Sequence, residues 1–174
     1  MEKLENYSII LILFRRVMLM EELDDLDRGI LRQLQLNGRI SISDLAQLVG
    51  LSSSPCWRRV RRLEEAGVIR RYGALIEPAA IGLELNAFVY LSLDLHQAQA
   101  FEAAILKRAE VVQCYALTGE QDYLLHVMAV NIQAFDHFLR NELVHMPGVE
   151  QVRTSFALKA IKSDALIPIH PTGD

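Results

Sequence analysis

An arginine-rich stretch in the first half of the chain has the residue types and spacing best suited to chemistry. Four arginines lie within residues 58–62, and two more follow at Arg70 and Arg71. The planar arginine fork is well matched to phosphates and guanine edges. Residues 52–71 hold six arginines and two glutamates, a net of +4, although the 174-residue chain has a net charge of −4. This local concentration predicts an anionic partner that is contacted by one element.

The spacing places these arginines on a helix that begins in the serine cluster 52–54 and ends at Gly67. At about 100° per residue its core stripe has three members: Cys56, Val60 and Leu63. Three arginines fall opposite this stripe: Arg58, Arg61 and Arg62. Arg59 and Trp57 flank it. A charged face of this kind is also typical of an ordinary solvated helix, so its place in the fold has to decide between the two interpretations.

Two short helices are predicted to precede the arginine helix. The first runs from Asp24 to Leu36 and is expected to end at Asn37-Gly38 in a left-handed conformation. The second is expected to be capped by Ser43 and closed by Gly50. Its predicted core face consists of Leu45, Leu48 and Val49. Three short helices with a tight glycine turn form a helix-turn-helix, and residues 67–76 are predicted to leave it as a strand.

The third helix of such a motif contacts nucleic acid, which favours DNA binding over a merely solvated face. The predicted base contacts, near the helix N-terminus, are Trp57, Arg58 and Arg61. The predicted contacts to backbone phosphates are Arg39, Arg62, Arg70 and Arg71. Three further candidates sit where free backbone N–H groups favour a phosphate: Ser52, Ser53 and Ser54.

The second half of the chain has a different pattern. Residues 1–20 are interpreted as an extension, 21–76 as the helix-turn-helix domain, 77–84 as a linker and 85–174 as a second domain. The second domain reads strand, helix, strand, strand, helix, strand: residues 85–95, 97–109 (with Phe101, Ile105 and Leu106 as the apolar stripe), 111–119, 122–130, 132–146 and 149–161. This order predicts an α+β, ferredoxin-like βαββαβ fold with both helices on one face of an antiparallel sheet. The bare face of such a sheet predicts a homodimer.

Several function classes are disfavoured. The apolar run Ile9–Phe14 is too short for a membrane span and lacks the layout of a signal peptide, so residues 1–20 are expected to lie outside the core fold or to pack on a partner subunit. Cys56 and Cys114 fit neither a disulfide framework nor a paired metal motif, which indicates a reducing cytoplasm. No histidine spacing suits a metal, and no nucleophile is paired with a base. We therefore expect neither a cofactor nor an enzyme.

The motifs LDDLDRGILRQLQLNGRISISDLAQLVGLSSSPCWRRVRRLEEAGVIRRYGALIEP, CYALTGEQDYLLHV and MPGVEQVRTSFALKAIK resemble the leucine-responsive/asparagine-regulator (Lrp/AsnC) family of transcription factors. The resemblance covers Leu23 to Ile169. It implies a winged helix-turn-helix followed by a ferredoxin-like (RAM) domain that senses an amino acid. It also implies dimers that assemble into octamers or similar rings, with a small amino acid bound between subunits.

Carried over by motif, the effector-binding residues are the turn residues Thr118, Gly119, Glu120, Gln121, Asp122 and Tyr123, with Ala116, Ile132, Thr154, Ser155 and Ala157 as neighbours. A glycine turn can offer backbone N–H groups to a carboxylate, and Asp122 can accept from an ammonium group. A turn-capping carboxylate is the alternative for Asp122. Several leucine-responsive members have an aromatic residue where this chain has Ser155, which implies a larger or more polar pocket and puts leucine in doubt.

The leading hypothesis is therefore a sequence-specific regulator that binds double-stranded promoter or operator DNA in the cytoplasm, with no membrane partner, and responds to an amino acid. Two alternatives remain at this point. One is a small-molecule enzyme or ligand-sequestering protein built on the second domain. The other is an architectural, chromatin-like protein with little sequence preference.

Overall fold

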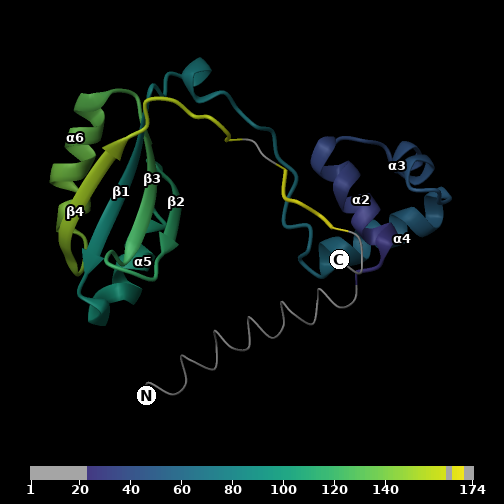
Figure 1. Ribbon diagram of the computed structural model, residues 1–174, viewed down its shortest axis with the longest axis horizontal. Helices are drawn as coiled ribbons and strands as arrows, with labels where there is room; N and C mark the ends of the chain where they lie inside the picture. Colours follow the sequence, from purple (N-terminus) through teal and green to yellow (C-terminus); the bar gives the residue numbers. More distant parts are fainter. Residues whose placement is uncertain (1–22, 164–165, 171–174) are drawn as a thin grey trace. The chain divides into compact units, whose positions relative to one another are not determined.

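The computed structural model describes residues 23–163 and 166–170, which belong to two compact units (Figure 1). Of the described residues, the first unit comprises Leu23–Ala74 together with Leu166–His170, and the second comprises Leu75–Ser163. The expected extension at residues 1–20 lies outside the described residues. The segment interpreted as a linker, residues 77–84, groups with the second unit, whereas Leu166–His170 groups with the first.

The first unit contains the helix-turn-helix. Its helices are α2 (Asp25–Leu36), α3 (Ile42–Leu48) and α4 (Ser53–Glu65). They enclose a small core of Ile30, Leu45, Ala46, Cys56, Val60 and Leu63. The predicted core stripe of α4 is confirmed, and Gly67 follows α4 with a positive φ of 72°. Arg58, Arg61 and Arg62, predicted to lie opposite this stripe, are all exposed.

Three details of α2 and α3 differ from the prediction. Asn37 is extended, with φ −146°, and its side-chain Oδ1 accepts from the Arg39 N–H at 3.0 Å, so α2 does not end in a left-handed residue. Ser41 rather than Ser43 caps α3, because its Oγ accepts from the Asp44 N–H at 3.1 Å. Leu48 is 60% exposed. It lies outside the stripe that α3 buries at helical spacing, which consists of Ile42, Leu45, Ala46 and Val49.

The predicted strand after α4 is wrong for the described chain. Residues 70–77 have no regular secondary structure, because a strand needs a hydrogen-bonding neighbour and all four strands of the described sheet come from the second unit. Tyr72 is nevertheless held in place. Its hydroxyl donates to Glu64 Oε1 at 3.0 Å, and burial followed by this hydrogen bond raises the pKa of Tyr72 to about 12.

The second unit has the predicted βαββαβ order. Its elements are β1 (Leu85–Leu93), α5 (Ala98–Ile105), β2 (Val111–Ala116), β3 (Tyr123–Ala129), α6 (Ile132–Asn141) and β4 (Val149–Phe156), with short 3-10 turns at Pro78–Ile81, Leu95–Gln97 and Leu143–His145. The strand order is β2-β3-β1-β4, and every neighbouring pair is antiparallel. The four strands and both helices of the sheet are visible in Figure 1. The α+β, ferredoxin-like prediction is confirmed.

One face of the sheet carries both helices. Alternate residues of β1 and β3 are buried in a single cluster with Phe101 of α5 and Phe138 of α6, as expected for a sheet covered on one side. Leu106, predicted to join this stripe, is 84% exposed because α5 ends at Ile105. Within the described residues no helix has the length and apolar character of a bilayer span.

The other face of the sheet carries aromatic and polar side chains that are only partly covered. Phe88 on β1 stacks on His126 of β3 with ring centroids 4.9 Å apart. The Nε2 atom of His126 lies 2.7 Å from Asn86 Oδ1. Burial lowers the pKa of His126, so the neutral imidazole is favoured on this face.

Candidate nucleic-acid and ligand interfaces

The outward face of α4 presents two arginines and an indole. Arg58 is exposed and has no ion-pair partner among the described residues. Arg61 lies 3.5 Å from Glu65 and 3.9 Å from Glu64, both loose surface pairs, and its guanidinium sits 5.9 Å from the ring centroid of Trp57. Exposed ion pairs of this kind contribute little to folding stability, so the Arg61 guanidinium can readily leave Glu64 and Glu65 for a phosphate. This face can therefore bind phosphates and base edges.

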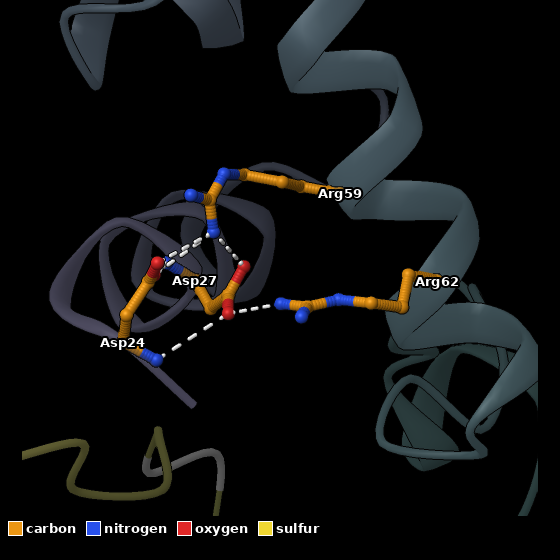
Figure 2. A network of polar contacts seen from close by, with 4 residues as sticks. All are labelled: Asp24, Asp27, Arg59 and Arg62. Atoms are coloured by element: carbon orange, nitrogen blue, oxygen red, sulfur yellow. Dashed lines mark hydrogen bonds and ion pairs between the residues drawn. The ribbon is translucent and has the colours of Figure 1, made fainter. Parts of the chain in front are cut away.

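The other two arginines of α4 turn toward α2 (Figure 2). Arg59 donates to both carboxylate oxygens of Asp24, at 2.8 and 3.0 Å, and to Asp27 Oδ1 at 2.8 Å. Arg62 is paired with the other oxygen of Asp27. Hydrogen bonding to Asp27, ahead of that to Asp24, raises the pKa of Arg59. Arg62, predicted to contact phosphate, thus has an internal partner while its side chain stays 52% exposed.

Sequence reasoning missed this network. Asp24 and Asp27 form a reciprocal capping box at the start of α2, in which Asp24 Oδ1 accepts from the Asp27 N–H at 2.9 Å. That hydrogen bond is the main reason why the pKa of Asp24 is lowered. The Asp-x-x-Asp spacing before an apolar run was the available signal for the capping box. The partnership with arginines of α4 required the tertiary structure.

The remaining predicted DNA-contact residues are all exposed in the first unit. Ser52 is the N-cap of α4 and makes no side-chain hydrogen bond to the helix, and Ser53 and Ser54 form its first turn. Arg39 lies between α2 and α3, and the other two arginines follow α4: Arg70 and Arg71. The N-terminal N–H groups of α4 and these cations lie within one small unit.

The predicted effector residues separate into two groups, and the first is the turn between β2 and β3. Asp122 Oδ2 accepts from the Leu93 N–H at 2.8 Å, so this carboxylate braces the end of β1, and Gln121 Oε1 accepts from Ser92 Oγ at 3.4 Å. Three turn residues are exposed: Thr118, Gly119 and Glu120. Gly119 has a φ of 143°, a conformation that L side chains rarely adopt. Ala116 is exposed on β2 just before the turn.

Tyr123 belongs to the core rather than to the exposed turn. It is only 5% exposed, and its ring packs edge-on against Phe101 with centroids 5.0 Å apart. Its hydroxyl donates to Glu102 Oε1 at 2.7 Å, and burial with this hydrogen bond raises the pKa of Tyr123. Within one chain the Tyr123 side chain is therefore a core residue at the start of β3, directly after the turn.

The second group lies beside α6 and the end of β4. Ile132, which is 48% exposed, and Thr154 line a shallow pocket of about 420 Å³ with Phe135 and Phe156. Ile132 and Ala157 line another pocket of about 330 Å³. Ser155, in contrast, faces the opposite side of the sheet, where it is paired with Phe88.

A single chain does not bring the two groups together. Leu91 of β1 pairs with Tyr123 beside the turn, whereas Ala87 pairs with Phe156 beside the second group. Four residues of strand separate these positions, which is about 13 Å along the strand, and the turn extends further away.

Neither group shows a metal site: the described residues contain no cluster of three or more potential ligands. Burial raises the pKa of both thiols, Cys56 and Cys114.

Two family models match this chain: winged helix-turn-helix DNA-binding over residues 23–70, and Lrp/AsnC ligand binding domain over residues 86–167. The leucine-responsive regulatory protein of Rhizobium meliloti (strain 1021) is 41% identical over 152 residues, which cover 85% of this chain and 97% of that protein. The Bkd operon transcriptional regulator of Pseudomonas aeruginosa is 39% identical over 153 residues, covering 86% of this chain and 100% of that protein. The chain belongs to the Lrp/AsnC family.

Solved structures agree with this assignment. A transcriptional regulator from Neisseria meningitidis, crystallised in complex with L-Met, superimposes with a TM-score of 0.80 and 42% identity, over 84% of this chain and 96% of that chain. AsnC of E. coli superimposes with a TM-score of 0.78 and 26% identity, over 84% of this chain and 99% of that chain. These matches confirm the predicted family and fold.

This Lrp/AsnC protein is a DNA-binding transcriptional regulator with a ligand-binding domain. Its relatives are transcriptional regulators rather than enzymes, which bears out the expectation that the chain is not an enzyme. The helix-turn-helix model covers α2, α3 and α4, and the ligand-binding model covers the sheet from Asn86, the second residue of β1, onward.

Proposed function

We propose that the protein binds double-stranded promoter or operator DNA through the outward face of α4, and that a small amino acid modulates this binding. The observation that carries the DNA half is the division of α4 into two faces. Arg59 and Arg62 anchor the helix to α2, while Arg58, Arg61 and Trp57 face outward. The exposed residues around α4 supply phosphate contacts in this proposal: Arg39, Ser52, Ser53, Ser54, Arg70 and Arg71.

The DNA half is tested by the salt dependence of binding. Replacing Arg58 and Arg61 together by alanine should flatten the slope of log affinity against log salt by about 3 to 4 units for a dimer, at roughly 0.9 per phosphate contact, and by less where a residue contacts bases. The matched control replaces two exposed lysines of the second unit, Lys107 and Lys159, and should leave the slope near that of the wild type. If both the affinity for DNA and its salt slope were unchanged in the arginine variant, α4 would have only a solvated face.

The amino-acid half rests on the separation of the two groups of effector residues. In our proposal each ligand lies between subunits, with the turn 118–122 of one chain and the pocket beside Ile132 and Thr154 of another. The turn can offer backbone N–H groups to the ligand carboxylate, and the second carboxylate oxygen of Asp122 can accept from the ammonium group. The apolar lining of the second pocket would set the side-chain size. The L-Met complex of the Neisseria meningitidis regulator supports an amino-acid ligand.

Dimerisation through the bare face of the sheet, followed by assembly into an octamer or similar ring, completes the proposal. This face presents partly covered aromatic and aliphatic side chains such as Phe88, Tyr90 and Leu124. A regulator of promoters acts where the chromosome is, so the proposed function is a cytoplasmic one.

Titration of each of the twenty amino acids into promoter complexes tests the sensing half. No change in affinity or footprint with any of them would remove it.

A further inference from the structure

The C-terminal segment Leu166–His170 lies against α2, although more than 130 positions separate the two in the chain. Gln35 Nε2 donates to the Ile167 carbonyl at 3.1 Å, and the Ile167 N–H donates to Gln35 Oε1 at 2.8 Å. One carboxamide therefore satisfies both main-chain groups of a single residue, as a neighbouring β-strand does.

Two arginines of α2 continue this series of contacts. Arg32 donates to the Ile169 carbonyl at 3.4 Å, and Arg28 donates to the His170 carbonyl at 3.3 Å. Positions 28, 32 and 35 share one face of a helix and span about 10 Å at 1.5 Å per residue. Residues 167–170 span about the same length when extended, so the two spacings match and the segment runs antiparallel to α2.

The side chains of the segment complete an apolar hollow in the first unit. Ile167 and Ile169 line this hollow, whose volume is about 640 Å³. Its other apolar residues are Leu31, Leu34, Val68, Ile69 and Tyr72, and the same hollow is bordered by Arg70 and Arg71. Pro168 lies between the two isoleucines, where its fixed φ favours an extended backbone and its missing N–H leaves no donor to satisfy.

We propose that Leu166–His170 is a docking segment that α2 of the same chain recognises through main-chain hydrogen bonds. The second unit is then attached to the first at both of its ends, once through residue 74 and once through the docked segment. Thr154 and Ser155 on β4 and Ala157 just after it, all predicted effector contacts, precede this segment by about ten residues. Ligand binding at the end of β4 can therefore strengthen or weaken the docking of this segment on α2 of the DNA-binding unit.

Docking itself is tested without DNA, on the full chain, by hydrogen exchange of the Ile167 amide. Replacing Gln35 by leucine removes both hydrogen bonds and should speed this exchange about fivefold or more, in line with the net contribution of one hydrogen bond. The matched control is Gln47→Leu, the same change at an exposed position of α3, which should leave the exchange rate unaltered. Equal rates in the wild type and the Gln35 variant would overturn the proposal.

The same-chain assignment has its own test. A photo-crosslinking amino acid at position 167, where the isoleucine borders the hollow and is 70% exposed, should join to peptides containing residues 31–35 or 68–72 within one chain. Crosslinked species of twice the chain mass would show that a second copy supplies the segment and would overturn the assignment.

The consequence for regulation rests on the proposed function and is measured separately. If the wild type responds to an amino acid, the Gln35→Leu variant should lose at least half of the effector-induced change in DNA affinity, while Gln47→Leu keeps it. A full response in Gln35→Leu would overturn the coupling. A wild type that responds to no amino acid would remove the proposed sensing function, whereas the exchange experiment would still decide whether the segment docks.

Discussion

The carboxylate of Asp27 in α2 accepts a hydrogen bond from Arg59 of α4 at 2.8 Å, and its second oxygen is paired with Arg62 (Figure 2). The Asp27 side chain is fully buried, whereas those of Arg59 and Arg62 are 26% and 52% exposed. A buried carboxylate needs its cationic partners, because an unpaired buried charge is strongly unfavourable. The pairing therefore fixes how α4 packs on α2 and leaves Arg58 and Arg61 on the free face.

Replacing Asp27 by asparagine should destabilise the first unit. Removing one partner of a buried ion pair typically costs about 3–5 kcal/mol, and we expect the lower end because both guanidinium groups reach solvent. Denaturant unfolding followed by the fluorescence of Trp57, the single tryptophan of the chain, measures the free energy of unfolding of this unit.

The matched control for this variant is Glu65→Gln, which removes a surface pair with Arg61. That pair is 3.5 Å long and exposed, so its loss should change the free energy of unfolding by less than about 1 kcal/mol. If Asp27→Asn proved as mild as Glu65→Gln, the network would not hold α4 in place.

Arg58 and Arg62 should respond differently to replacement by alanine, although both are exposed residues of the same helix. Arg58→Ala should weaken DNA binding and leave the unfolding free energy within about 0.5 kcal/mol of the wild type, because Arg58 has no partner among the described residues. Arg62→Ala should lower stability as well, because it leaves Asp27 with one partner fewer. Paired measurements of DNA affinity and unfolding separate these effects. Identical behaviour of the two variants would contradict the division of α4 into two faces.

The features that follow local periodicity could be predicted from the sequence. Cys56, Val60 and Leu63 recur at helical spacing and are buried, and the alternation along β1 follows from its period of two. The predictions that were wrong depend on where a helix ends or on whether a strand has a partner. Leu106 is exposed because α5 ends at Ile105, before the predicted end at residue 109. The strand expected at residues 67–76 has no neighbouring strand to pair with among the described residues.

The contacts that define the candidate sites could not be predicted, because they join distant parts of the chain. Asp27 and Arg62 are 35 positions apart, and Gln35 and Ile167 are 132 apart. An arginine on an outward face can reach back to a neighbouring helix, since its long side chain decouples the position of the charge from that of the backbone. Helical periodicity placed the Cα of Arg62 correctly but not its guanidinium.

Acidification should weaken the second unit through His126. Burial lowers the pKa of His126 below its ordinary value of 6.5, so the unfolded chain binds the proton more readily than the folded one. The free energy of stabilisation that His126 contributes is fully present above about pH 6.5 and is lost as the pH falls below that value. Thermal unfolding by circular dichroism between pH 7 and 5 should show a steeper loss for the wild type than for His126→Gln.

The control for this pH dependence is His137→Gln, on an exposed position of α6. That variant should keep the slope of the wild type, because it leaves His126 and its neighbours Phe88 and Asn86 intact. Parallel pH profiles for the wild type and His126→Gln would show that protonation of this imidazole is not linked to folding.

Subunit complementation should decide whether the amino-acid site lies between chains. Gly119→Val strains the turn, whose φ of 143° suits glycine, and Ile132→Asp places a carboxylate in the other group at an N-terminal helix position that tolerates acidic residues. Each variant alone should bind no ligand. In a dimer with one chain of each kind, a site formed by two chains gives one intact site and one doubly altered site. Isothermal titration of co-expressed mixed dimers should therefore recover about half of the wild-type stoichiometry. A site contained within one chain gives none, because every chain then carries one damaged group.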